Sequence, residues 1–291
     1  MTGKAQAICH GAATIINAIA LGQGAAFGVD LWTKAQVELT NEPKTISGEI
    51  TSDPYENTKL IETAVKRVLN HFKVENIGAK VTTWSNIPIA RGLKSSSTAA
   101  NAIVLATTAA LGRKLDDEIL INLSVDAAFD AKVTQTGAYD DACAAYFGNA
   151  VVTDNIERKI VKRSSLPLDT TILFHVPNLK SYTINTKPAK METIKPLVKV
   201  AYNEALRGNY WGALTLNGLI YSAALRYDTK LVSDALQAGA LAAGLCGKGP
   251  ATTIVTTKEK IGAVKAAVRD YPGELLQSKL NREKAAVIQN G

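Results

Sequence analysis

The residues from 88 to 100, PIARGLKSSSTAA, combine a glycine, a lysine and a run of hydroxyl side chains. They run from a loop into an alanine-rich stretch that favours a helix beginning near Ser95. The first turn of a helix presents unpaired N–H groups and the positive end of its dipole, and both attract phosphate. Gly92 lets the backbone approach a ligand closely, and Lys94 adds a point charge. An ordinary serine-capped helix is the alternative, but the thirteen-residue pattern favours an anion site.

Two groups of acidic residues follow this loop. Asp126 and Asp130 are four residues apart and share one face of a predicted helix. Their like charges repel unless a cation lies nearby, so either a metal ligand or a solvated acidic face fits them. Asp140 and Asp141 precede the apolar residues 142–147. An acid that enters an apolar run is hard to explain as surface decoration, which makes this pair a candidate for chemistry.

The third element is the glycine-rich segment 244–253, GLCGKGPATT. Its glycines permit a tight turn that leads into a strand, and a simple connector between a helix and a strand is the alternative. Two other nucleotide fingerprints are excluded. The sequence around Gly247 lacks the Walker A spacing, and the glycines from Gly22 to Gly28 precede a strand pattern, whereas a dinucleotide fingerprint precedes a helix.

Periodicity places these segments among alternating strands and helices. Strands are predicted at 29–40, 79–85, 150–153, 170–176 and 252–256. Helices are predicted at 57–72, 95–111, 116–132, 194–206, 210–224, 228–241 and 258–270. The pattern restarts after Arg163, which predicts two domains, 1–165 and 166–291. Strands and helices in both halves indicate an α+β architecture.

The composition of the chain limits the classes of protein to which it could belong. The 291 residues are 46% hydrophobic and 20% charged, which is typical of a globular chain that needs no disulfide or metal to fold. The net charge of +7 raises nucleic-acid binding as an alternative, but the basic residues are scattered among acids. Three widely spaced cysteines predict a reduced, cytoplasmic compartment. The uncharged stretch 5–29 is too polar and glycine-rich to cross a membrane.

Together, the three segments resemble the GHMP kinases, the superfamily of galactokinase, homoserine kinase, mevalonate kinase and phosphomevalonate kinase. The superfamily's loop, P-x-x-x-G-L-x-S-S, is matched from Pro88 to Ser96, with Lys94 where relatives usually have a small residue. Residues 136–148 are similar to its acidic catalytic segment, 247–250 to its glycine-rich motif, and Gly3-Lys4 to its first motif. Within the superfamily, the whole chain is similar to the archaeal-type shikimate kinases.

This resemblance implies a two-domain GHMP fold, with a ribosomal-protein-like N-terminal domain and a ferredoxin-like C-terminal domain. It implies transfer of the γ-phosphoryl group of ATP to shikimate with Mg²⁺, a step toward chorismate and the aromatic amino acids. Catalysis would then depend on positioning and charge neutralisation. Another alcohol, such as homoserine or a mevalonate derivative, is the alternative acceptor, and a non-enzymatic nucleic-acid binder is the alternative from another class.

The resemblance also implies roles for individual residues. Asp140 would orient the acceptor hydroxyl, as a base or as an electrostatic anchor, and Lys4 would lower the pKa of that hydroxyl or neutralise developing charge. Ser96 and Asp130 would bind Mg²⁺. An arginine would bind the shikimate carboxylate, with Arg91, Arg207 and Arg226 as candidates. The residues expected to wrap the phosphates are Pro88, Ile89, Ala90, Arg91, Gly92, Leu93, Lys94, Ser95, Ser96, Ser97 and Thr98, with Gly247 and Gly249.

Overall fold

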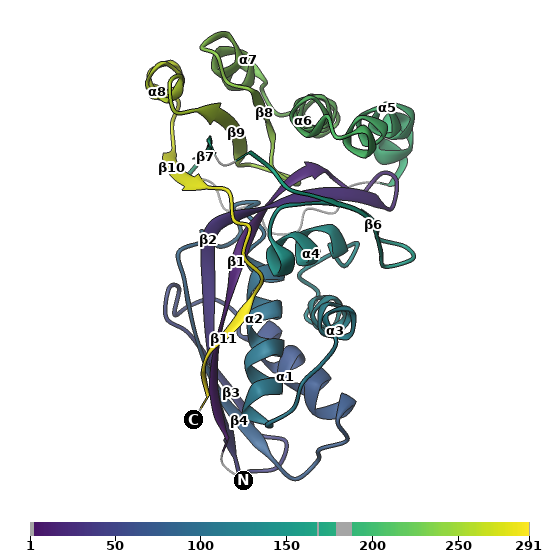
Figure 1. Cartoon of the computed structure of the whole chain (residues 1–291), viewed down its shortest axis with the longest axis vertical. Helices are drawn as coiled ribbons and strands as arrows, with labels where there is room; N and C mark the ends of the chain where they lie inside the picture. Colours follow the sequence, from purple (N-terminus) through teal and green to yellow (C-terminus); the bar gives the residue numbers. More distant parts are fainter. Residues whose placement is uncertain (1–2, 168, 179–187, 291) are drawn as a thin grey trace.

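The computed structural model describes residues 3–167, 169–178 and 188–290, which form two antiparallel-rich sheets with helices packed against them (Figure 1). The larger sheet has seven strands in the order β11-β1-β2-β4-β3, with β5 paired to β2 and β6 to β5. Its strands are β1 (Lys4–Ile16), β2 (Gln23–Thr40), β3 (Ile46–Ile50), β4 (Gly78–Ser85), β5 (Ala150–Asp154), β6 (Lys159–Ser164) and β11 (Ala286–Asn290).

The two longest strands of this sheet are β1 and β2, which pair with each other antiparallel. The hairpin that they form extends out to the second half of the chain (Figure 1). The first part of β2 pairs with β5 and its last part pairs with β4. From Val29 onward, buried residues alternate with more exposed ones along β2, which confirms the predicted half-buried strand. This alternation lets one strand face the helices and solvent at once.

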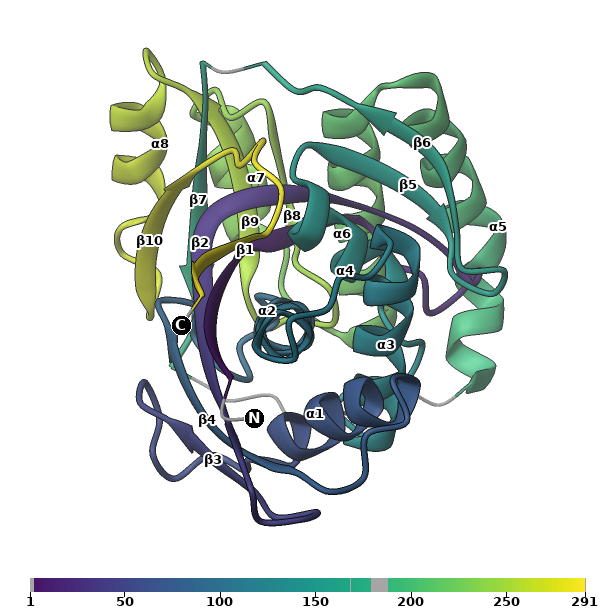
Figure 2. The same ribbon diagram turned by 60° about the horizontal axis from the view of Figure 1, so that its bottom comes forward.

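Four helices cover one face of the larger sheet: α1 (Lys59–His71), α2 (Ser95–Ala110), α3 (Asp117–Asp130) and α4 (Tyr139–Phe147). Seen end on in Figure 2, α2 lies between the curved β1–β2 pair and the other three helices. Alanine, serine and threonine dominate α2, and most of its residues are buried. Small side chains allow the helix to pack closely on all sides, which places its N-terminus deep in the molecule.

The second sheet has four strands in the order β10-β7-β9-β8, all antiparallel. Its strands are β7 (Thr170–Val176), β8 (Ala242–Leu245), β9 (Thr252–Thr257) and β10 (Glu274–Lys279). Its helices are α5 (Pro188–Arg207), α6 (Tyr210–Leu225), α7 (Lys230–Gln237) and α8 (Ile261–Val268). One buried cluster joins Phe27 and Val152 of the larger sheet to Phe174 and Tyr202 of this part, so the two parts share a core.

The chain passes from one sheet to the other after β6, which ends at Ser164, and before β7, which begins at Thr170; the division into two domains at 165 stays a prediction. It then returns at its C-terminus, where β11 pairs with β1. The helices and strands predicted from periodicity all occur, with ends shifted by several residues at some helices. Periodicity missed β1, β3, β6, β8, β10 and β11. Among the described residues, no helix has the length and apolar character needed to cross a membrane.

Candidate active site

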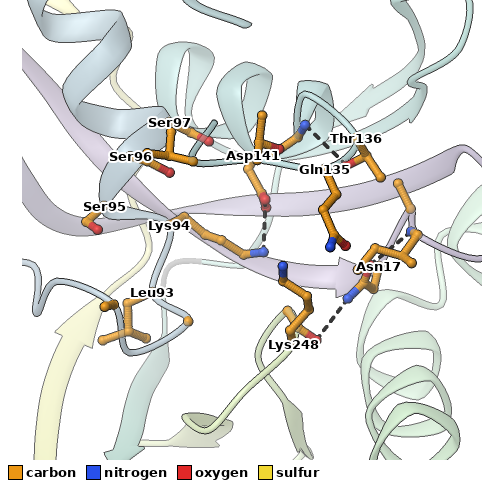
Figure 3. A pocket seen from close by; sticks show the side chains of 18 of the residues that line it. Asn17, Leu93, Lys94, Ser95, Ser96, Ser97, Gln135, Thr136, Asp141 and Lys248 are labelled. Carbon is orange, nitrogen blue, oxygen red and sulfur yellow. Dashed lines mark hydrogen bonds and ion pairs between the residues drawn. The ribbon is translucent and has the colours of Figure 1, made fainter. Parts of the chain in front are cut away.

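The N-terminus of α2 opens into a cavity of about 440 Å³. Lys94 immediately precedes the helix in a left-handed conformation, with φ of +62°, and no side chain caps the first turn. That turn also contains no acidic residue. Ser95, Ser96 and Ser97 line the cavity beside these free N–H groups (Figure 3). The arrangement is suited to holding an anion with backbone and hydroxyl donors.

The serine loop rests on the glycine-rich turn between β8 and β9. Gly92 has φ of +85°, and a Cβ there would lie 2.8 Å from the carbonyl oxygen of Gly249 and 2.9 Å from that of Cys246. The Ala251 N–H donates to the Arg91 carbonyl at 3.3 Å. Only glycine permits both this conformation and this approach. The two segments therefore fold as one loop pair around the cavity.

A buried ion pair lies at the centre of the site. The Lys94 ammonium is 2.9 Å from Oδ2 of Asp141, in the first turn of α4 (Figure 3). Only 4% of the Asp141 side chain is exposed, and its Oδ1 has no partner among the described residues. Burial lowers the pKa of Lys94, but the surrounding negative charges, that of Asp141 first among them, together outweigh burial and raise the pKa. The ion pair therefore places a cation and a carboxylate side by side in the wall of the cavity.

Asp140 is also buried, and it has a different partner. Its Oδ1 accepts a hydrogen bond of 2.8 Å from the Asn155 side chain. A Cβ at Gly24 would lie 2.7 Å from its carboxyl carbon, so β2 packs directly on the carboxylate. Burial and the neighbouring charge of Asp141 raise the pKa of Asp140 to about 7. Asp140 and Asp141 both line the cavity, but their partners differ. Asp140 accepts a hydrogen bond from Asn155, whereas Asp141 pairs with Lys94.

This raised pKa predicts a pH dependence of stability. Between pH 4 and pH 7, the folded chain holds the Asp140 proton while the unfolded chain has lost it. The free energy of unfolding therefore falls as the pH rises through this range. Asp140→Asn keeps the shape and removes the titration, so the variant should gain stability relative to the parent as the pH rises from 4 to 7. Urea denaturation across this range measures the difference, and parallel curves would contradict the assignment.

The far wall of the cavity is formed where β1 ends. The Asn17 side chain donates to the Gly247 carbonyl at 2.9 Å, and its backbone N–H donates to Asn217 at 3.1 Å. The Tyr221 hydroxyl donates to the Asn17 carbonyl at 3.0 Å. Both Asn217 and Tyr221 belong to α6. These bonds join the first hairpin, the glycine-rich turn and the second half of the chain at the site.

The structure brings most of the residues expected in the site to this cavity. Those that line it are Ile89, Ala90, Gly92, Leu93, Lys94, Ser95, Ser96, Ser97, Asp140, Gly247 and Gly249. Pro88 and Arg91 instead line an adjoining cavity of about 290 Å³, which shares Ile89 with the first. The buried Thr98 hydroxyl donates back to the Lys94 carbonyl at 3.1 Å and so holds the helix start.

Lys4 is not brought to this cavity. It lies at the start of β1, with its ammonium 3.8 Å from Glu38, which belongs to the far end of β2. Glu38 is 14 residues along β2 from Gly24, which contacts Asp140. At about 3.3 Å per residue, this is roughly 45 Å of strand. A lysine there cannot reach an acceptor hydroxyl beside Asp140.

Asp130 is likewise held elsewhere. Its two oxygens accept from the Arg67 guanidinium at 2.6 and 2.7 Å, between α3 and α1. The pair is partly exposed, and the Arg67 hydrogen bonds lower the pKa of Asp130. Asp126 points the same way, toward Arg67 and Arg158. The repulsion between these acids is therefore relieved by arginines, and the structure does not place Asp130 beside Ser96.

Asp130→Asn is expected to leave turnover and its dependence on Mg²⁺ within about twofold of the parent. The change removes one charge of a partly exposed ion pair, which contributes about 0–1 kcal/mol to the free energy of unfolding. Initial rates over a series of Mg²⁺ concentrations measure the effect. A large shift of the Mg²⁺ dependence would restore Asp130 as a metal ligand.

None of the three arginines considered for the acceptor lines the 440 Å³ cavity. Arg91 donates to the Pro177 carbonyl. Arg207 pairs with Glu204 at 2.8 Å on the exposed side of α5, and Arg226 is the C-cap of α6. The basic residues that line the cavity are Lys94, Lys132 and Lys248.

Sequence reasoning did not assign the roles suggested by Asp141, Asn17 and Lys248. A signal for Asp141 was present, because a lysine inside a buried serine loop requires a carboxylate partner. Asp140 and Asp141 were both candidates for this partner, and only the orientation of α4 shows which of them contacts Lys94. Asn17 and Lys248 gave no such signal, since each occupies a turn whose position depends on tertiary contacts.

Comparisons with known proteins show what this chain is similar to. The family of GHMP kinases N terminal domains matches residues 59–149, which include the serine loop and both aspartates. A shikimate kinase of Methanosarcina mazei is 42% identical, over 98% of this chain and 97% of its own. A shikimate kinase of Methanothermobacter thermautotrophicus is 39% identical, over 96% of each chain.

Solved structures share the fold. A homoserine kinase of Cytophaga hutchinsonii superposes with a TM-score of 0.74 at 17% identity, over 98% of this chain and 97% of that one. A mevalonate diphosphate decarboxylase of Staphylococcus aureus gives 0.75 at 15% identity, over 99% of each chain. These likenesses confirm the predicted α+β fold of the GHMP type.

Proposed function

Because the chain belongs to the GHMP kinase family and to its archaeal-type shikimate kinases, we propose that it transfers the γ-phosphoryl group of ATP to shikimate. The observation that carries the proposal is the Lys94–Asp141 ion pair beside the free N-terminus of α2, inside one cavity. A phosphate site, a cation and a carboxylate in the same cavity are what transfer to an alcohol requires.

The serine loop supplies the phosphate site. The N–H groups at the start of α2 and the hydroxyls of Ser95, Ser96 and Ser97 surround the space for the β- and γ-phosphates. The adjoining cavity, which shares Ile89, gives room for the nucleoside. Arg91 and Pro88 would then lie between the two parts of the nucleotide.

The transfer itself needs one proton to move. The acceptor oxygen forms a bond to the γ-phosphorus as the bond to the bridging oxygen breaks, and ADP leaves with the electron pair. The hydroxyl proton passes to the carboxylate of Asp141, a residue that lines the cavity. Lys94 pairs with this carboxylate at 2.9 Å and adds positive charge beside the phosphoryl group. Asp140, held by Asn155, supports the wall on which the acceptor lies.

Mg²⁺ fits this site as an ion that arrives with the nucleotide. The Ser96 hydroxyl is a hard oxygen ligand at the phosphate end of the cavity, and Mg²⁺ takes most of its remaining ligands from phosphates and water. Among the described residues, no cluster of three acidic, histidine or cysteine side chains could hold a metal. When bound, Mg²⁺ would neutralise charge on the phosphates. The cytoplasm, which supplies ATP and keeps the three buried cysteines reduced, is the compartment we propose.

Release of ADP, measured with shikimate, homoserine and mevalonate as separate acceptors, tests this function. We expect ADP release to depend on shikimate and to yield a phosphorylated product that mass spectrometry detects. Equal rates with and without shikimate, or a clear preference for another alcohol, would contradict the proposal.

A further inference from the structure

Lys248 places a positive charge in the cavity that no acidic residue neutralises. It lies between Gly247 and Gly249 in the turn from β8 to β9, and its side chain extends into the space between Lys94 and Asn17 (Figure 3). In the described parts of the chain, no carboxylate lies within ion-pair distance of its ammonium. Burial and the charge of Lys94 lower the pKa of Lys248. An anion bound here would relieve both effects.

The two lysines at the centre of the cavity therefore differ. Lys94 is matched by Asp141 at 2.9 Å. Lys248 faces the open space, on a turn that Asn17 fixes through its bond to the Gly247 carbonyl. Asn217 and Tyr221 hold Asn17 in turn, so hydrogen bonds from α6 through Asn17 position this wall. A cation held in place by such contacts is well suited to selecting one ligand.

The position of Lys248 distinguishes the acceptor from the nucleotide. The phosphates of ATP bind at the serine loop in the proposed function. In-line transfer then requires the acceptor to lie on the opposite side of the γ-phosphorus. That side is formed by Asp141, Asn17 and the turn that carries Lys248 (Figure 3). A second anionic group on the acceptor would face this turn while the hydroxyl faces Asp141.

We infer that Lys248 binds the carboxylate of the acceptor and so restricts the enzyme to alcohols that carry an acid. The inference rests on the proposed function, and it gives the carboxylate the partner for which an arginine was expected. An uncharged acceptor would leave the ammonium half-buried without a counterion, which disfavours its binding. Lys248 thereby becomes a specificity residue, with no part in the movement of the proton.

The test compares shikimate with its methyl ester in the parent enzyme and in Lys248→Met. Loss of a charge-assisted hydrogen bond should raise KM for shikimate about 10- to 100-fold. KM for the methyl ester should stay constant or fall, and KM for ATP should stay within about twofold. Lys248→Arg should recover much of the lost affinity, and Lys258→Met, which removes an exposed lysine outside the cavity, should resemble the parent. Thermal unfolding of each variant checks that it is folded.

The outcomes separate the two proposals. A parent that releases no ADP with shikimate overturns the proposed function, and the role of Lys248 with it. A parent that is active, with a variant that loses affinity equally for the acid and the ester, overturns the role of Lys248 alone. The same holds if KM rises for ATP and stays constant for shikimate, because Lys248 would then contact phosphate.

Discussion

Asp141→Asn is expected to lower kcat for shikimate phosphorylation by about 10²- to 10⁴-fold, the usual contribution of a general base. Asparagine has nearly the same shape, so the cavity persists, but its side chain cannot take the hydroxyl proton. The nucleotide site lies on the other side of the ion pair, so ADP affinity should change by less than about fivefold. Stopped assays with shikimate and fluorescence titration with ADP measure the two quantities.

The matched control for this variant is Asp270→Asn, because Asp270 is an exposed aspartate whose ion-pair partner among the described residues is its neighbour Arg269. It should retain the activity of the parent. Asp140→Asn is a second comparison, since Asp140 lines the same cavity but its Oδ1 is occupied by Asn155. If Asp140→Asn lost far more turnover than Asp141→Asn, the proton would pass to Asp140, and the assignment of the base would be wrong.

The second large effect concerns stability. Lys94→Met leaves the Asp141 carboxylate buried without its counterion, and breaking a buried pair in this way costs about 3–5 kcal/mol of the free energy of unfolding. The double variant Lys94→Met/Asp141→Asn removes both charges and should recover a large part of this loss. Urea denaturation at pH 7 measures all three proteins against the parent.

Activity and stability should separate in this set. The double variant should be folded and inactive, because it restores packing while it removes the base and the cation. If Lys94→Met alone failed to fold, the recovery of folded protein in the double variant would still show the coupling. A double variant no more stable than Lys94→Met would contradict the idea that charge pairing holds the serine loop to α4.

How far the sequence predicts the fold depends on the kind of element. Regular strands and helices with a clear apolar period were found, as for the strand that begins at Val29 and the helix α1. β1 was missed although burial alternates along its first half, because its second half is buried throughout and shows no alternation. β11 was missed because a short strand at the end of the chain is defined by the partner it finds, here β1.

The site divides in the same way. The serine loop could be predicted because its function needs a local pattern: a flexible residue, hydroxyls and a helix start in direct succession. The roles of Lys4 and Asp130 rested on resemblance, and the structure places Lys4 with Glu38 and Asp130 with Arg67. Sequence periodicity indicates which side chains share a face of a helix or strand, but not which residues of other elements that face will meet.

The amino-acid sequence by itself determined the GHMP resemblance, the phosphate loop and the segment that supplies the acid, since each is a contiguous string whose local chemistry suffices. Only the tertiary structure decided which aspartate meets Lys94, which wall Asn17 braces and which lysine stays without a counterion. Those relations join residues more than forty positions apart, and they depend on how α2, α4 and the β8–β9 turn pack together. Tertiary packing sets these distances, and they cannot be predicted from the spacing of the residues along the sequence.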